Sequence, residues 1–213
     1  EISRQLPWRV PLRTCPLVLE GGSVETDGAG TLLTTQQCLA HPGRNPDLDN
    51  AALDAQLREW LGVRDIIRLH NGELAGDDTD AHVDTLARFC GPETVAYVQC
   101  TDPADPHEPT LRAMEAELEG HARAHGWTLV PLPLPPALHG AEGERLPATY
   151  ANFLILNDAV LLPVYGVDTD ETARVRLQQA FPDRDVETVH CTPLLEQHGS
   201  LHCATLQLPE GVL

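Results

Sequence analysis

The feature that most constrains the fold of this chain is an internal repeat. The order strand, strand, helix, strand is predicted three times, and the first strands begin near residues 17, 82 and 149. A repeated unit of this size buries its apolar face against its neighbours. We therefore predict an α/β fold built as an array of ββαβ modules.

The predicted elements follow apolar periodicity and turn signals. In chain order they are strands 17–20 and 31–35, helix 50–61, strand 66–69, strands 83–89 and 95–100, helix 108–125, strand 127–132, strands 150–156 and 160–165, helix 170–180 and strand 186–190. A fourth copy is predicted to begin with a strand at 201–206, where the chain ends. In a closed radial array its missing strands would come from the N-terminal side.

The charge balance narrows the class of partner. The 213 residues include 14 Lys and Arg against 32 Asp and Glu, a net charge of −18. Phosphate backbones and anionic membranes would be repelled, so we expect no nucleic acid and no membrane partner. Small cations would be attracted, although most of the excess is expected to be solvated surface.

Targeting and cysteine patterns favour a cytoplasmic protein. No apolar run reaches membrane-spanning length, and no basic segment followed by an apolar one opens the chain. The first residue is Glu1, so we expect an upstream portion to have been removed. The six cysteines form no CxxC pair, and we assign five of them to the core in reduced form: Cys15, Cys38, Cys90, Cys100 and Cys191.

The stretch from Gly76 to Asp84 puts four carboxylates and one imidazole within nine residues. If Val83 begins a strand, the period of two places His82 and Asp84 on one face. A His beside a carboxylate holds its proton more readily and can deliver it to a leaving group. The alternative is an acidic turn that caps a strand, in which Asp78, Thr79 and Asp80 satisfy loop amides.

Polar residues fall on the first strand of each predicted copy. They are Glu20, then His82 and Asp84, then Asn152, then Cys203. Equivalent strands of a radial array line its axis, so these side chains are predicted to converge. Cys203 would then be a nucleophile whose thiolate is stabilised by a bound cation.

Two other interpretations of the same residues stay open at this point. Most single cysteines are buried hydrophobes, and Cys203 could be one. Alternatively His82, Asp84, Cys203 and one of His198 or His202 could ligate zinc, although the compact ligand pairs of structural zinc sites are absent from the sequence. No phosphate-binding loop or dinucleotide fingerprint is present either.

Five motifs in register identify a family. They are Leu19-Glu20-Gly21-Gly22-Ser23, Arg44-Asn45-Pro46, the stretch 76–84, the stretch 145–153 and His202-Cys203. Together, from about Leu17 to Pro209, they resemble the agmatine deiminases and bacterial peptidylarginine deiminases. The resemblance implies the pentein fold, an α/β propeller of five ββαβ modules around a central site.

The resemblance also implies roles for single residues. Cys203 would attack the guanidinium carbon, and His82 would protonate the departing ammonia and then deprotonate the hydrolytic water. Asp84 would hold the guanidinium nitrogens, and Asp78 would lie at the mouth of the site. Glu20 and Asn152 would support the pocket. No metal and no organic cofactor are implied.

The sequence departs from the family pattern in two ways. It contains no Trp-x-Arg-Asp-x-Gly-Pro motif, whose Asp is the second guanidinium carboxylate in the family, and Ala81 stands where Gly is common. Residues 197–201 replace a glycine-rich run before the catalytic Cys. We therefore expect residues 1–213 to form a single guanidine-modifying domain that lacks its N-terminal modules and is inactive or very slow alone.

The predicted function is a cysteine-dependent deiminase acting on agmatine or a related small cationic guanidine. The alternatives are an amidinotransferase of the same fold and a guanidinium-binding fragment without catalysis. A homo-oligomer is possible from the sequence, which does not determine the assembly.

Overall fold

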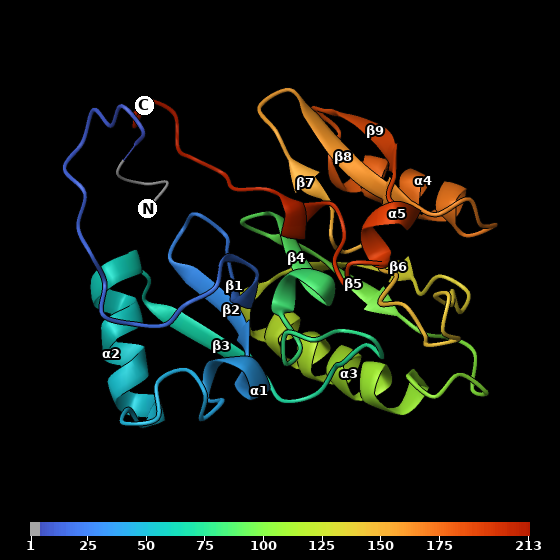
Figure 1. The fold of residues 1–213 in the computed structure, drawn as a ribbon, viewed down its shortest axis with the longest axis horizontal. Coiled ribbons are helices and arrows are strands. Elements are labelled where there is room, and N and C mark those ends of the chain that lie inside the picture. The colour runs from blue at the N-terminus through green and yellow to red at the C-terminus, as the bar shows by residue number, and fades with distance from the viewer. Residues whose placement is uncertain (1–4) are drawn as a thin grey trace.

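Three small sheets form the fold (Figure 1). The structure, a computed structural model, describes residues 5–213. The sheets are β1 (Val24–Thr26), β2 (Thr31–Thr35) and β3 (Asp65–Leu69), then β4 (Ala87–Gly91), β5 (Thr94–Gln99) and β6 (Thr128–Pro133), then β7 (Leu154–Ile155), β8 (Ala159–Val164) and β9 (Asp185–His190).

All three sheets have the same topology, which confirms the predicted repeat. In each, the first two strands pair antiparallel and the second and third pair parallel. A parallel pair needs a crossover connection, which a helix supplies in each case. The crossover helices are α2 (Asn50–Leu61), α3 (Glu108–His125) and α4 (Asp170–Ala180).

The helix bounds follow from local capping. The Asp49 side chain accepts a hydrogen bond from the Ala52 amide at 2.8 Å and so begins α2. Gly62 and Gly126 end α2 and α3 in the left-handed conformation that glycine adopts readily. The predicted bounds of the three long helices are confirmed. Two one-turn helices, α1 (Gln36–Leu39) and α5 (Thr192–Leu195), were not predicted.

Three apolar clusters form the core of the described residues, and the two larger ones each combine residues of two neighbouring modules. In the second module α3 buries Leu111, Met114 and Leu118 in the same cluster as Val95 and Tyr97 of β5. Burying each large side chain contributes on the order of 1.5–3 kcal/mol. The modules therefore form a firm frame for the segments between them.

A buried ion pair joins the three modules. Arg88 of β4 donates from Nε to Glu25 of β1 at 2.6 Å and from a terminal nitrogen to the Phe153 carbonyl at 2.8 Å. The Phe89 amide donates to the second oxygen of Glu25 at 3.1 Å. Removing one partner would leave a buried charge unpaired, which costs about 3–5 kcal/mol. The pair therefore fixes the modules at the level of their first strands.

The predicted first strands are wrong in a consistent way. Residues 17–20 form no strand, β4 begins at Ala87 rather than Val83, and β7 is limited to Leu154–Ile155. The predicted strand at 201–206 is instead the 3-10 turn η4 (His202–Ala204), so the described residues contain no first strand of a fourth module. Within residues 5–213, no helix has both the length and the apolarity to cross a membrane.

Candidate active site

The polar residues singled out in the sequence lie in turns just ahead of the strands, not on them. Glu20 precedes the 3-10 turn η2 (Gly21–Ser23), and His82 precedes η3 (Val83–Thr85). Asn152 lies two residues before β7, and Cys203 lies within η4. The prediction that His82 and Asp84 share one face of a strand is therefore wrong, although both side chains line the same pocket.

The same kind of side-chain hydrogen bond occurs in each of the turns η2, η3 and η4. Ser23 donates its hydroxyl to the Glu20 carbonyl at 2.7 Å, Thr85 to the His82 carbonyl at 2.9 Å, and Thr205 to the His202 carbonyl at 2.8 Å. A Ser or Thr hydroxyl bonded three residues back competes with the extended strand. A hydroxyl residue three positions after Glu20, His82 and His202 is the sequence signal that would have indicated these turns.

Cys203 and Asp84 meet on one side of the pocket. The Cys203 thiol donates to Oδ2 of Asp84 at 3.8 Å, and His202 Nδ1 lies 2.8 Å from the same oxygen. Asp84 is 1% exposed, and its other oxygen, Oδ1, is buried without a hydrogen-bond partner among the described residues. An unpaired buried carboxylate oxygen is costly, so this site favours a donor that arrives with a ligand.

Asn152 holds the turn that carries the thiol. Its side-chain oxygen accepts hydrogen bonds from the amides of His202 at 2.8 Å and Cys203 at 3.2 Å. Its amide nitrogen donates to the Asp84 carbonyl at 3.3 Å. The fully buried Asn152 thus links the third module to η3 and η4. Its predicted place as a support of the pocket agrees with these contacts.

His82 lines the same pocket and pairs with Glu20, which lies behind it. His82 Nε2 lies 3.0 Å from Oε2 of Glu20. A carboxylate only accepts, so Nε2 carries the proton and Nδ1 is the nitrogen left to exchange protons when the ring is neutral. Desolvation raises the pKa of Glu20, but the hydrogen bonds from His82 and Arg44 outweigh it and hold the pKa below its ordinary value. Glu20 therefore stays an anion beside the imidazole.

Arg44 has a larger part than its motif alone suggested. It donates to Glu20 from Nε at 2.8 Å, to Asp80 at 2.8 Å and to the Thr79 carbonyl at 2.9 Å. Asp80 and Ala81 both have φ near +63°, a conformation that costs free energy in residues with a β-carbon. Arg44 therefore fixes both Glu20 and the strained end of the acidic loop from which His82 follows.

The acidic loop at 76–81 is a turn held by its own side chains, as the alternative interpretation predicted, but Asp77 and Thr79 bind the loop amides, not Asp78 and Asp80. Asp77 accepts hydrogen bonds from the Thr79 hydroxyl at 2.5 Å and the Ala81 amide at 2.9 Å. Asp78 is exposed and lines the pocket, in agreement with a place at its mouth. The loop thus combines a structural turn with an exposed carboxylate in the wall of the pocket.

The pocket has a volume of about 560 Å³, which suits a small molecule. Gly21 and Gly22, residues 197–199 and the tail at 205–207 complete its wall. A β-carbon at Gly22 would lie 2.6 Å from His82 Nδ1 and 2.8 Å from Asp84 Oδ2. Glycine is therefore required there, because the imidazole and the carboxylate both approach the backbone at that point.

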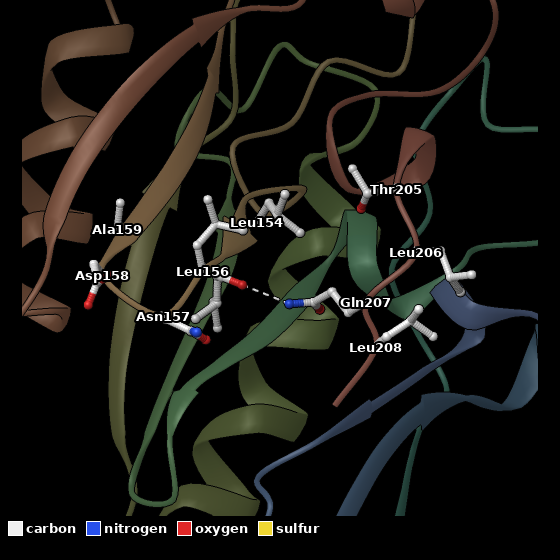
Figure 2. Close-up of a pocket in the computed structure, with 10 residues that line it drawn as sticks. Leu154, Leu156, Asn157, Asp158, Ala159, Thr205, Leu206, Gln207 and Leu208 are labelled. Carbon is white, nitrogen blue, oxygen red and sulfur yellow. Dashed lines mark hydrogen bonds between the residues drawn. The ribbon is translucent and has the colours of Figure 1, made fainter. Parts of the chain in front are cut away.

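The chain after Cys203 also borders a second cavity (Figure 2). The second cavity, of about 520 Å³, lies between residues 154–159 and 205–208. Gln207 donates from its side chain to the Ile155 carbonyl at 2.7 Å and holds the tail against β7. Thr205, Leu206 and Gln207 line both cavities.

The six cysteines differ in burial more than the sequence analysis predicted. All six are free, but only Cys38 and Cys191 are fully buried. Cys90 and Cys100 are half-buried against the core clusters, and Cys15 packs into none of them, so its assignment to the core is wrong. Although Cys203 is exposed as a residue, desolvation of its sulfur and the charge of Asp84 raise its pKa. The free thiol is thus mostly protonated.

The geometry does not bring the predicted zinc ligands together as one set. His198 is exposed and bonds through Nδ1 to the Gly76 carbonyl at 3.0 Å, while His202 pairs with Asp84. Among residues 5–213, a different group has metal-ligand spacing: Glu20, Cys38 and His82, whose ligand atoms lie within 4.8 Å of one another.

Fold and site together define the class of protein: an α/β array of ββαβ modules with a thiol, an imidazole and carboxylates around an acidic pocket. Residues 1–209 match the family model of the Porphyromonas-type peptidyl-arginine deiminases. The agmatine deiminase of Pseudomonas fluorescens is 38% identical over 92% of this chain and 58% of its own length. This chain therefore spans less than two thirds of that relative.

Two solved structures of agmatine deiminases are similar to this chain in sequence and in fold. A cysteine-to-serine variant of C. jejuni agmatine deiminase with substrate bound is 40% identical, with a TM-score of 0.87 over 91% of this chain and 57% of its own. The agmatine deiminase of Enterococcus faecalis is 32% identical, with a TM-score of 0.82 over 90% and 57%. The chain belongs to the family of Porphyromonas-type peptidyl-arginine deiminases and agmatine deiminases.

Proposed function

We propose that this chain carries most of the active site of a deiminase that hydrolyses the guanidinium group of agmatine or a similar small guanidine. The observation that carries the proposal is the meeting of Cys203 with Asp84 at 3.8 Å in the pocket that His82 also lines. A thiol, a proton carrier and a buried anion are the three groups that guanidinium hydrolysis requires.

Asp84 binds the substrate in this proposal. A guanidinium presents planar N–H donors that match a carboxylate, and Oδ1 of Asp84 is a buried acceptor with no partner among the described residues. The cation also reverses the local charge: in the free protein Asp84 raises the pKa of Cys203, and a bound guanidinium lowers it again. Thiolate formation is thereby coupled to substrate binding.

The bond changes then follow in two stages. The Cys203 thiolate attacks the guanidinium carbon, the carbon–nitrogen bond breaks, and ammonia leaves with a proton from His82. Water, deprotonated by His82, attacks the resulting amidino thioether carbon and expels the thiolate, which leaves a ureido product. Glu20 stabilises the protonated imidazole at 3.0 Å in both stages.

The proposed architecture is a five-module propeller of which three modules are present here. Two findings support this architecture. The chain contains three repeats, and it spans only 57–58% of the length of the relatives that it matches. The resemblance places the second guanidinium carboxylate in the Trp-x-Arg-Asp-x-Gly-Pro motif, which residues 1–213 do not contain. We therefore propose that residues 1–213 alone bind a guanidine but turn it over very slowly.

The test is release of ammonia and a ureido product from agmatine. Cys203→Ala is expected to abolish whatever rate the wild type shows, and calorimetry is expected to detect agmatine binding to residues 1–213 in either case. Turnover retained in Cys203→Ala would refute the proposal. Product that forms only with an added amine acceptor would instead indicate an amidinotransferase.

A further inference from the structure

Cys38 has no part in the proposed reaction, yet it lies against the imidazole–carboxylate pair. Its buried thiol donates to Oε2 of Glu20 at 3.7 Å, the same oxygen that lies 3.0 Å from His82 Nε2. Thr35 holds Cys38 there, because its hydroxyl accepts from the Cys38 amide at 3.3 Å and donates to the Ala81 carbonyl at 2.7 Å. The thiol is thus tied to the loop that precedes His82.

The spacing of these atoms fits a tetrahedral metal. Zinc bonds of about 2.0–2.3 Å place neighbouring ligand atoms roughly 3.3–3.7 Å apart. The ligand atoms of Glu20, Cys38 and His82 all lie within 4.8 Å of one another, and two of the three separations are 3.0 and 3.7 Å. Small side-chain shifts would bring all three onto one ion, with a fourth position left for water.

The surrounding charge also permits a dication. Arg44 already pairs with Glu20, but through Oε2 alone, and Oε1 has no hydrogen bond within the described part of the chain. Glu20 can therefore ligate through Oε2, the oxygen next to Cys38 and His82, while its free Oε1 accepts the hydrogen bond from Arg44. Asp80 lies on the far side of Arg44 at 2.8 Å and offsets its charge. A carboxylate, a thiolate and an imidazole are a ligand set that zinc prefers.

We propose that Glu20, Cys38 and His82 form a zinc site whose occupation blocks the deiminase. Coordination replaces the Cys38 thiol proton, which passes to solvent, and the Nε2 proton of His82, which moves to Nδ1, so the imidazole can no longer take up a proton in the reaction. Cys203 stays outside this site, beside Asp84. The inhibitory consequence rests on the proposed function, whereas metal binding does not, so binding is measured separately from activity.

Co²⁺ is the probe for binding, since thiolate coordination produces a charge-transfer absorption in the near ultraviolet. Titration of residues 1–213 with Co²⁺ is expected to produce this band, and excess Zn²⁺ is expected to remove it by displacement. A wild-type chain that shows no thiolate band would overturn the proposal, whatever its activity.

Single variants identify the thiol. Cys38→Ser and His82→Ala are each expected to lose the band or weaken Co²⁺ binding at least tenfold, while Cys203→Ser keeps it. Cys191→Ser is the matched control, since it removes another buried thiol that is not near the site. A band that persists in Cys38→Ser and disappears in Cys203→Ser would refute the assignment. Circular dichroism establishes that each variant folds.

Activity provides the second arm. With agmatine as substrate, micromolar Zn²⁺ is expected to inhibit the wild type reversibly, with recovery on adding a chelator. Folded Cys38→Ser is expected to keep its turnover while becoming at least tenfold less sensitive to Zn²⁺. Equal sensitivity of the two proteins would overturn the inhibitory role. If residues 1–213 neither bind agmatine nor turn it over, the proposed function fails, while the cobalt titration still decides the site.

Discussion

The Nδ1 of His202 lies 2.8 Å from Oδ2 of Asp84, so the carboxylate that is proposed to bind the guanidinium already has one partner in the free protein. Oδ1 of the same carboxylate is buried and unpaired in the described structure. A guanidinium can therefore bind Oδ1 without displacing His202. This arrangement makes Asp84 the principal anchor for substrate charge.

Removal of that charge should weaken binding strongly. Asp84→Asn is expected to raise the Kd for agmatine roughly thirtyfold or more, because a buried charge-assisted pair is lost. This corresponds to a loss of about 2 kcal/mol of binding free energy. Asp78→Asn removes an exposed carboxylate from the same pocket and should change the Kd by at most roughly fivefold. Calorimetric titration measures both, and equal effects of the two substitutions would contradict the assigned roles.

Gly22 should tolerate no side chain. Gly22→Ala is expected to lower the deiminase rate by roughly 10²-fold, because its β-carbon would displace His82 and Asp84 from contact distance. The neighbouring Gly21→Ala is the matched control, since a β-carbon there meets nothing within 4 Å. Steady-state kinetics on both variants would count against the geometry if Gly21→Ala were as impaired as Gly22→Ala.

Arg44 should act on the reaction and on stability together. Arg44→Met is expected to lower the free energy of unfolding by about 2 kcal/mol, since it leaves Glu20, Asp80 and the Thr79 carbonyl without their donor. Its kcat should fall as well, because Glu20 then no longer fixes the imidazole of His82.

An exposed arginine serves as the control for that variant. Arg174 pairs with Glu171 on the surface, and Arg174→Met should leave the free energy of unfolding close to that of the wild type. Urea denaturation and kcat are measured on both variants. If Arg44→Met kept the wild-type stability and the wild-type kcat, the contacts of Arg44 would contribute neither to stability nor to catalysis.

The alkylation rate of Cys203 should depend on pH in a defined direction. Desolvation and the Asp84 charge raise the pKa of the thiol, so in the free protein its reaction with iodoacetamide should reach half its maximum at a higher pH than that of an ordinary cysteine. Asp84→Asn removes the negative charge and should shift this midpoint to lower pH. Peptide mapping measures the alkylation of Cys203 alone. The same midpoint pH in the wild type and in Asp84→Asn would argue against an effect of the Asp84 charge on the Cys203 thiol.

The sequence was sufficient for the parts of the fold that local physics decides. Amphipathic spacing and glycine caps placed α2 and α3 at their observed bounds, and the repeat predicted three identical sheet topologies. The first strands failed because two or three alternating residues have the same pattern in a strand and in a 3-10 turn. The hydroxyls of Ser23, Thr85 and Thr205 decide in favour of the turn.

The motifs named residues that lie at or behind one pocket, but did not predict how those residues pair. Glu20, Asp78, His82, Asp84, Asn152 and Cys203 were named from motifs, and all but Glu20 and Asn152 line the pocket. Those two support it from behind, through His82 and through the backbone of η4. The contacts of Arg44, Cys38 and His202 arise from segments far apart in sequence, which no local pattern reveals.

The most direct test of the account is to look for the covalent intermediate on Cys203. The protein is mixed with agmatine, quenched in acid during turnover and analysed by peptide mass spectrometry. We expect an amidino adduct on the Cys203 peptide in the wild type, more of it in His82→Ala, because hydrolysis then lacks its base, and none in Cys203→Ala, which should also release no ammonia. Ammonia release that continues in Cys203→Ala, or an adduct found only on another cysteine, would contradict the central claim.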